Sequence, residues 1–194
     1  MNPDRKYRKS DLPENAKRVF EGKIFDVYQW EQKLYDGTTA TFEKIARPDT
    51  VTIFPILDDG RILLIEDSQP HRETILTSPA GRVDNGETPE EAAKRELHEE
   101  TGYISEMWEP FYVHEPYGKI DWVVYAFIAK KLKKDGEPHF DPGEEIKEHP
   151  VTFDELIDLV RGGEKYRDDF TQVVLEAVAD PLKMTELRKK LSPL

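Results

Sequence analysis

The segment from Glu87 to Glu100 concentrates carboxylates at helical spacing. It holds six glutamates against one lysine and one arginine, and its clear apolar positions are two alanines and one leucine. Glu96 and Glu100 would share a helix face one turn apart. Glu99 would lie about 60° round from Glu96, so all three fit an arc of about 100°. Like charges at this spacing repel, and a hard divalent cation such as Mg²⁺, which prefers oxygen ligands, would offset that repulsion.

A Mg²⁺ ion held by such a stripe keeps several waters and takes phosphate oxygens from a substrate. It also lowers the pKa of a bound water and so generates a nucleophile. The segment therefore favours metal-assisted hydrolysis of a phosphate compound. The alternative is a solvated helix whose charges have no chemical role, which is the commoner fate of a helix rich in Glu, Lys and Arg.

Local signals give this helix its ends. Thr88 stands before Pro89 and three residues before Glu91, which is the pattern of a capping box with proline in the first turn. Gly102 follows the last turn as a C-terminal glycine. The sequence therefore predicts a helix that begins after Thr88 and ends before Gly102.

The loop before the helix is suited to a phosphate ligand. Gly81 and Gly86 bracket it, and glycine lets the backbone come close to a ligand. Arg95 is placed to pair with Glu87, and this pair would fix the loop to the helix.

Strand signals dominate the chain before this loop, and helix signals close it. The predicted elements before the helix are two or three antiparallel strands over 19–45, two buried strands at 51–57 and 61–67 joined as a hairpin, and a loop with a short extended piece at 68–81. Those after it are strands at 108–116 and 120–132, a polar loop at 133–150, and helices at 152–163, 168–180 and 181–191. This order predicts a mixed α/β sandwich rather than strict βαβ alternation.

Composition limits the class of protein. The chain has 194 residues, which suits one domain or one domain with a small extension. A net charge of -12 argues against a general binder of nucleic acid or of a membrane surface. The absence of cysteine excludes disulfides, thiolate nucleophiles and zinc–thiolate sites. No apolar run approaches the ~18 residues that span a bilayer, and the charged start lacks an apolar core, so a cytoplasmic protein is expected.

The spacing of residues between 81 and 103 resembles the Nudix box, the sequence motif of the Nudix family. The matching positions are Gly81, Glu87, Arg95, Glu96, Leu97, Glu99, Glu100 and Gly102, followed by Tyr103 where the family usually has an aliphatic residue. The resemblance implies a Nudix-type α/β/α sandwich with a mixed sheet, preceded by a small N-terminal antiparallel β-sheet. The expected division is a β-rich dimerisation segment at 1–47, ending near Arg47-Pro48, and a Nudix hydrolase domain at 48–194.

The same resemblance implies roles for the box residues. Glu96 and Glu100 would be the principal ligands of Mg²⁺, with Mn²⁺ as a possible substitute, and the carbonyl of Ala80 would complete the site. Glu99 would be a further ligand or an acceptor just outside the ligands. Glu87 and Arg95 would hold the loop.

Flanking features resemble the branch of ADP-ribose pyrophosphatases and nucleoside-diphosphate-sugar hydrolases. These features are the "SPAGRVDNGE" entry to the box, the β-rich segment before it, and Pro116, a proline near the position where these enzymes often carry one. The resemblance implies hydrolysis of ADP-ribose to AMP and ribose 5-phosphate, or of a related nucleoside diphosphate sugar, by a homodimer built through the N-terminal sheet. Alternatives are hydrolysis of oxidised nucleoside triphosphates or dinucleotides, and a non-catalytic nucleotide-sensing domain.

The substrate-binding residues are chosen by side-chain chemistry. Aromatic rings stack on nucleobases and arginines hold phosphates, although aromatics in a strand are more often core and arginines are as often solvated. The candidates are Phe25, Tyr28 and Trp30 for the base and Arg47, Arg72 and Arg82 for the phosphates. Arg72 is preferred because it is expected in the loop just before the box.

A second set of carboxylates lies far along the chain. In the ADP-ribose branch, a glutamate on a mobile loop after the last long strand helps to activate water or to bind a second metal. Glu144 and Glu145 are the matching residues, and an ordinary acidic loop is the alternative. The tripeptide Ser-Gln-Pro at 68–70 is interpreted as a turn after a strand, and no histidine is assigned a role.

Overall fold

The computed structural model of the chain describes residues 12–115, 118–140, 143–163, 166–168 and 170–193. Residues 1–11 and Pro116, which carry predictions from the sequence, lie outside the described residues.

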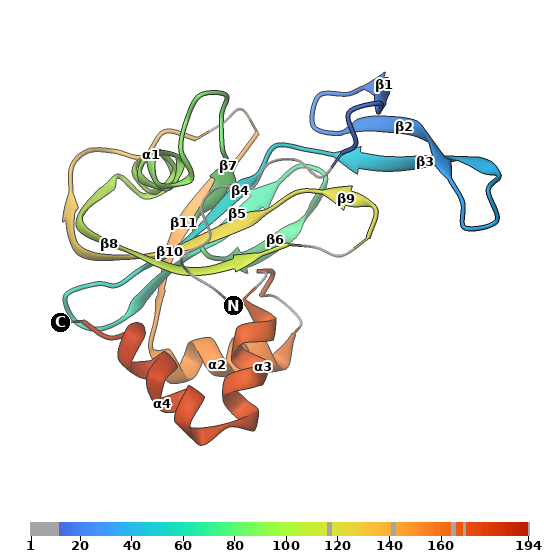
Figure 1. The fold of residues 1–194 in the computed structure, drawn as a ribbon. Helices are drawn as coiled ribbons and strands as arrows, with labels where there is room; N and C mark the ends of the chain where they lie inside the picture. Colours follow the sequence, from blue (N-terminus) through green and yellow to red (C-terminus); the bar gives the residue numbers. More distant parts are fainter. Residues whose placement is uncertain (1–11, 116–117, 141–142, 164–165, 169, 194) are drawn as a thin grey trace.

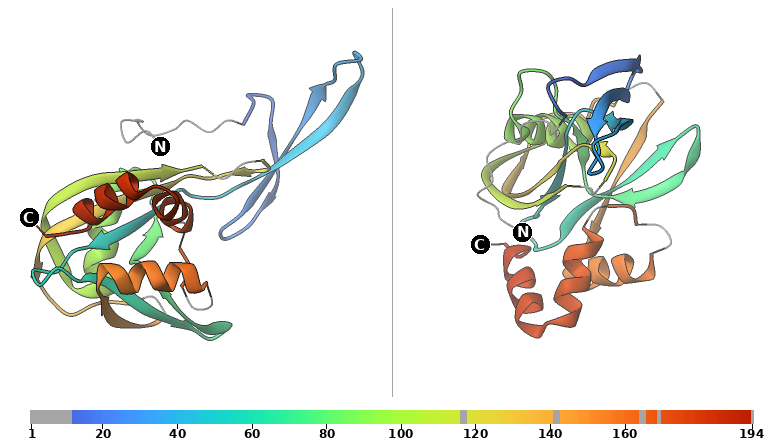
Figure 2. Two further views of the ribbon diagram at one scale, coloured as in Figure 1. Left: turned by 90° about the horizontal axis from the view of Figure 1, so that it is seen from below. Right: turned by 45° about the vertical axis from the view of Figure 1, so that its right-hand side comes forward.

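The first strands form a small antiparallel sheet that projects from the rest of the chain (Figures 1 and 2). Its strands are β1 (Lys17–Glu21), β2 (Asp26–Lys33), β3 (Thr39–Ala46) and the short β9 (Ile120–Asp121), which pairs parallel to β3. Gly37 turns β2 into β3 with a positive φ of 86°, which favours glycine. The predicted N-terminal antiparallel sheet is therefore present, with one strand added from a distant part of the chain.

The central sheet is mixed and buried on both faces. It has the order β7-β4-β10-β8 and contains β4 (Thr50–Pro55), β7 (Ala80–Arg82), β8 (Tyr103–His114) and β10 (Val124–Lys134). β10 runs parallel to β4 and antiparallel to β8. Along β4, Val51 and Ile53 belong to one apolar cluster and Phe54 to another, because successive side chains point to opposite faces.

Helices cover both faces of these strands, as Figure 1 shows. They are α1 (Pro89–Thr101), α2 (Phe153–Gly162), α3 (Thr171–Ala179) and α4 (Pro181–Lys190). α1 contributes Leu97 to the cluster around Val51, whereas α2 to α4 pack on the cluster around Phe54. There the ring centroids of Phe54 and Phe170 lie 4.7 Å apart, which ties the start of α3 to the sheet. The predicted α/β/α sandwich with a mixed sheet is confirmed.

The expected hairpin of 51–57 and 61–67 is formed only at its turn, where the backbone N–H of Leu57 donates to the carbonyl of Arg61 at 2.8 Å. Ile56 and Ile62 form a single bridge beside the turn, but β4 and the following strand then enter different sheets. The third sheet has the order β11-β5-β6 and contains β5 (Ile62–Gln69), β6 (Arg72–Thr77) and β11 (Glu145–Val151). The strands separate because β4 is already paired with β7 on one side and β10 on the other.

Two expected loops are also partly strand. Residues 72–77, expected as a loop with a short extended piece, form β6 and pair with β5. Residues 145–151, expected as part of a polar loop, form β11 along the other edge of β5. Both strands are stabilised by backbone hydrogen bonds to the apolar β5, so their own side chains need not be apolar.

Candidate active site

Helix α1 carries the box glutamates, and its two ends are formed as the sequence predicts. The Thr88 side chain accepts a hydrogen bond from the backbone N–H of Glu91, and Glu91 accepts one from the backbone N–H of Thr88. Gly102 ends the helix in the left-handed conformation with a φ of 67°. Ala92, Ala93 and Leu97 are fully buried. This narrow apolar stripe fixes the helix on the sheet and leaves the carboxylates on its flank.

Strand β7 passes against the helix at Gly81. A Cβ added at this residue would lie 1.9 Å from the carboxyl carbon of Glu96, so any other residue would push that carboxylate out of its present position. One residue earlier, the backbone N–H of Ala80 donates to Glu100 Oε2 at 2.9 Å. The β7 backbone therefore contacts both glutamates that the sequence nominates as metal ligands.

Arg95 organises the loop and the carboxylates around it. Its Nε and Nη2 donate to the two carboxylate oxygens of Glu87, each at 3.0 Å, and Nη2 also donates to the carbonyl of Arg82 at 2.9 Å. Its Nη1 donates to Glu96 Oε1 at 2.7 Å and to Glu99 Oε2 at 2.9 Å. These bonds raise the pKa of Arg95, and its hydrogen bond lowers the pKa of Glu87. The predicted pair of Arg95 and Glu87 is thus formed and links the loop to the helix.

The two nominated metal ligands, Glu96 and Glu100, are partly buried carboxylates. Burial raises the pKa of Glu96 above its usual value, against the opposing hydrogen bond and charge of Arg95. Burial also raises the pKa of Glu100 well above its usual value, and the backbone N–H of Ala80 opposes this shift. Further negative charges raise the pKa of Glu100 in the same direction, namely those of Glu96, Glu144 and Asp67. The positive charge near Glu96 and Glu100 therefore does not offset the effect of burial and of the neighbouring carboxylates on their pKa values.

These carboxylates line a cleft of about 650 Å³. Its walls come from β7, α1 and the segment between β10 and β11. The lining residues are Ala80, Gly81, Arg82, Asp84, Arg95, Glu96, His98, Glu99, Glu100, His139, Phe140 and Glu144. The segment after β10 is held against the end of α1, because the backbone N–H of His139 donates to the carbonyl of Glu99 at 2.7 Å.

Strand register explains which of the two later glutamates enters the cleft. Glu145 pairs with Ser68 at the start of the β11–β5 ladder and is exposed. Glu144 precedes it and lies opposite Gln69, whose Nε2 donates to Glu144 Oε1 at 3.1 Å. Glu144, the residue just before β11, lines the cleft, and Glu145, the first residue of β11, is not among its lining residues.

The donor chemistry of this cleft fits a divalent cation. Buried carboxylates with raised pKa values gain most from a nearby cation, and Glu96 and Glu100 prefer the hard metals. In the described part of the chain, no three acidic or histidine side chains are yet arranged around one point. Arg95 explains this arrangement, because its guanidinium draws Glu96 and Glu99 toward itself. A metal ion ligated by Glu96 and Glu99 would have to compete with Arg95 for their oxygens.

The sequence family agrees with this geometry. The NUDIX domain matches residues 46–173 of the chain. The chain belongs to the Nudix family. It is a Nudix pyrophosphohydrolase, as the sequence predicts.

Two known proteins and one solved structure are similar to this chain over most of its length. The ADP-ribose pyrophosphatase of Bacillus subtilis (strain 168) is 31% identical over 154 residues, which are 77% of this chain and 82% of that protein. The methanol dehydrogenase activator of Bacillus methanolicus is 29% identical over 150 residues, which are 75% of this chain and 80% of that protein. The crystal structure of an ADP compounds hydrolase has the same fold, with a TM-score of 0.67, 22% identity, and coverage of 95% of this chain and 97% of that one.

The structure separates the three arginines that the sequence nominates for phosphates. Arg82 lines the cleft of about 650 Å³ that holds the box carboxylates, here called the Nudix cleft. It also lines a smaller cleft of about 280 Å³ beside it, and Arg47 lines only the smaller one. The guanidinium of Arg47 lies 4.7 Å from the ring centroid of Trp122. Arg72 is not in a loop before the Nudix box: it begins β6, pairs with Asp67 and lines neither cleft.

The three nominated aromatic residues lie in or beside the N-terminal sheet. Phe25 stands beside Arg47, with 5.6 Å from the guanidinium to the ring centroid, and Trp30 packs against Phe42 in the sheet. Phe25, Tyr28 and Trp30 do not appear among the described residues that line the two clefts. Within one copy of the chain, the structure therefore does not bring them to the Nudix box.

Sequence reasoning missed several residues at these clefts. His98, His139 and Phe140 line the Nudix cleft, and Asp168 lines the smaller one. His98 carried the clearest signal, because it lies on the box helix between Glu96 and Glu99. The others come from distant segments, and no spacing in the sequence reveals their approach.

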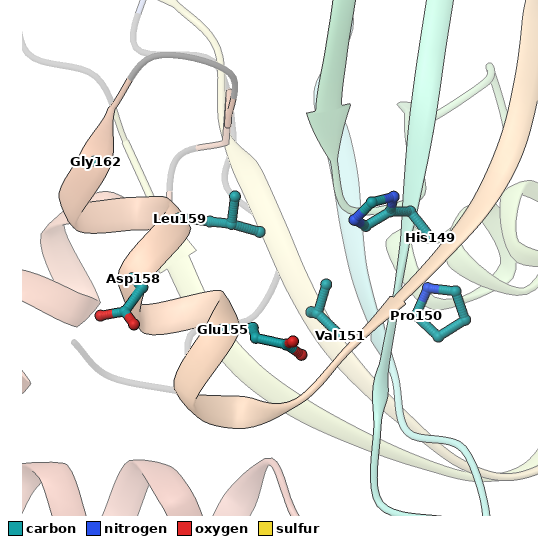
Figure 3. A pocket seen from close by; sticks show the side chains of 7 residues that line it. All are labelled: His149, Pro150, Val151, Glu155, Asp158, Leu159 and Gly162. Atoms are coloured by element: carbon teal, nitrogen blue, oxygen red, sulfur yellow. The ribbon is translucent and has the colours of Figure 1, made fainter.

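Another cavity of about 530 Å³ lies between β11 and α2 (Figure 3). Its lining residues are His149, Pro150, Val151, Glu155, Asp158, Leu159 and Gly162. None of the Nudix box glutamates is among them, so the hydrolytic chemistry belongs to the other cleft.

Within the described residues, no helix is both long enough and apolar enough to cross a membrane.

Proposed function

We propose that the protein hydrolyses the pyrophosphate bond of ADP-ribose, giving AMP and ribose 5-phosphate, or that of a related nucleoside diphosphate sugar. The observation that carries this proposal is the meeting of Glu144 with the box carboxylates Glu96, Glu99 and Glu100 around one cleft. The likeness to a relative named ADP-ribose pyrophosphatase supports the choice of substrate. The division at residue 47 and a cytoplasmic location remain predictions of the sequence.

The residues of the cleft divide the work of hydrolysis. Glu96, Glu100 and the carbonyl of Ala80 would hold Mg²⁺, or Mn²⁺ in its place, which supplies Lewis acidity and a bound water of lowered pKa. Glu144 accepts the proton of the water that attacks one phosphorus of the P–O–P link. The β7 backbone holds Glu100 through the N–H of Ala80, and Arg95 holds the loop through Glu87, so the frame of the site needs little reorganisation during the reaction.

Arginines beside the cleft are suited to the substrate phosphates. Arg82 borders both clefts, and Arg47 stands in the smaller one, so a diphosphate that lies across β7 would reach both guanidinium groups.

A screen of hydrolysis with Mg²⁺ tests the proposed substrate. We expect ADP-ribose to give AMP and ribose 5-phosphate with a higher kcat/KM than dinucleotides or nucleoside triphosphates, and EDTA to remove the activity. Products are identified by chromatography, and excess Mg²⁺ added after EDTA is the control for reversibility. Preference for an oxidised nucleoside triphosphate would contradict the proposed substrate, and full activity in EDTA would contradict the metal.

The N-terminal sheet is proposed as the dimer interface. It exposes apolar side chains that a monomer would leave in water, including Val19, Phe20, Ile24 and Phe25. Exposed apolar patches of this kind mark protein–protein contacts. Two-fold pairing of this sheet would cover them and bring a second copy of Phe25, Tyr28 and Trp30 near the substrate.

The substitution Phe20→Glu should convert a dimer into a monomer, because it places a charge in the proposed apolar contact. Light scattering measures the change in mass, and deletion of residues 1–46 should have the same effect. Leu182→Glu is the matched control, since Leu182 is 76% exposed on α4 and Phe20 is 59% exposed. A wild-type monomer, or a dimer that survives both changes, would refute this interface.

A further inference from the structure

The turn that joins β5 to β6 lies against the segment that carries Glu144. The β11–β5 ladder begins with Glu145 opposite Ser68, so the preceding residue, Glu144, comes opposite Gln69. The side chains of this last pair meet, because Gln69 Nε2 donates to Glu144 Oε1 at 3.1 Å. The interpretation of Ser-Gln-Pro at 68–70 as a turn after a strand is wrong for its first two residues, because Ser68 and Gln69 end β5 and the turn itself begins at Pro70.

Gln69 is itself held in place by its neighbours on the hairpin. Its Nε2 lies 3.5 Å from Asp67 Oδ2, and Asp67 forms an ion pair with Arg72 at the start of β6. Across the same hairpin, Ser68 Oγ and Thr74 Oγ1 are 2.7 Å apart and share a hydrogen bond. The amide group therefore presents its N–H groups to carboxylates, and the end of β5 that carries it is held to β6 by side-chain contacts.

The turn also meets the backbone next to Glu144. A Cβ built at Gly143 would lie 3.8 Å from Pro70 Cδ, which is ordinary contact distance. Gly143 has a φ of 95°, a conformation that other residues rarely adopt. Pro70 thus packs against Gly143, the residue before Glu144, and the Gln69 side chain restrains the Glu144 side chain.

An amide is a suitable partner for a carboxylate in this place. The cleft already contains Glu96, Glu99 and Glu100, and repulsion from them favours conformations of Glu144 that turn away from the cleft. A neutral donor can restrain the carboxylate by a hydrogen bond without adding a cation that competes with the substrate or metal for its oxygens.

We propose that Gln69 is the positioning residue for Glu144, and that the end of β5 with Pro70 is the support that keeps this glutamate in the Nudix cleft. The inference rests on the proposed role of Glu144 as the acceptor of the water proton. Gln69 itself touches neither substrate nor metal in this scheme; it acts through the hydrogen bond to Glu144.

The test is Gln69→Met, which keeps the length of the side chain and removes its donor. We expect kcat to fall by roughly tenfold to a hundredfold, because small displacements of a catalytic group are costly, while KM changes by less than about twofold. Gln69→Glu, which replaces the amide nitrogen by oxygen and repels Glu144, should lose more. In the double variant Gln69→Met/Glu144→Gln, turnover should equal that of Glu144→Gln alone, because both changes remove one interaction.

Gln172→Met is the matched control. Gln172 donates to Glu176 Oε1 at 3.3 Å on the exposed face of α3, so the same change removes an equivalent bond away from the cleft and should leave kcat unaltered. Thermal unfolding of all variants separates a loss of fold from a loss of turnover. A kcat of Gln69→Met within about twofold of wild type would overturn the role of Gln69 but leave that of Glu144 intact. Additive losses in the double variant would do the same. A silent Glu144→Gln would instead remove the proposed role of Glu144, and this inference with it.

Discussion

Glu100→Gln should lower kcat by about a hundredfold, which corresponds to a loss of about 3 kcal/mol of transition-state stabilisation from the metal site. The same substitution should not destabilise the protein in EDTA. The reason is that burial raises the pKa of the Glu100 carboxyl in the folded state, so that its ionised form opposes folding above the usual pKa of glutamate. Steady-state kinetics and thermal unfolding, each with EDTA and with Mg²⁺, measure the two effects.

Glu96→Gln should behave in the same way, and Glu90→Gln is the control for both. Glu90 lies on the exposed side of the same helix, where it pairs with Lys94, and its loss should leave turnover unchanged. Mg²⁺ should raise the Tm of the wild type, because a ligand stabilises the state that binds it, and should raise that of Glu100→Gln much less. Near-normal turnover in Glu96→Gln and Glu100→Gln would refute the assignment of the metal site.

Glu144→Gln should lower kcat by about 10²-fold or more, the usual contribution of a positioned general base. Glu145→Gln should remain within about twofold of wild type, because the neighbouring side chain points away from the cleft. The two variants differ by one position and carry the same chemical change, so each is the control for the other. Single-turnover kinetics with ADP-ribose measure the chemical step directly.

Two outcomes would contradict this assignment. A silent Glu144→Gln would show that another group accepts the proton, and a large loss in Glu145→Gln alone would show that β11 pairs with β5 in a different register during the reaction.

The sequence predicts the parts of the site that depend on neighbours in the chain. Thr88, Glu91 and Gly102 define the ends of α1 by local hydrogen bonds and backbone conformation, so their pattern is readable before the fold is known. The sequence predicts the pair of Arg95 and Glu87 for a similar reason. The two residues are only eight positions apart, across the start of α1.

Contacts between distant segments could not be predicted in the same way. β11 has few apolar residues and forms because β5 offers it an edge, so its sequence resembles that of a polar loop. The choice between Glu144 and Glu145 depends on this pairing and was therefore undecidable from the sequence. The sequence also predicts a hairpin after β4, since Asp58-Asp59-Gly60 is a turn signal, but pairing with β7 and β10 places β4 in another sheet.

The pairing of Glu145 with Ser68 also determines where the chain tolerates changes in length. Insertions or deletions before Gly143 would leave the ladder intact, so they could reshape the rim of the cleft while Glu144 keeps its place. A single-residue insertion within β11 that shifted its pairing with β5 would exchange the faces of its side chains. Glu145 would then point toward the cleft in place of Glu144. Substrate preference can thus diversify in the length of the preceding loop, whereas the hydrolytic chemistry depends on an unchanged strand register.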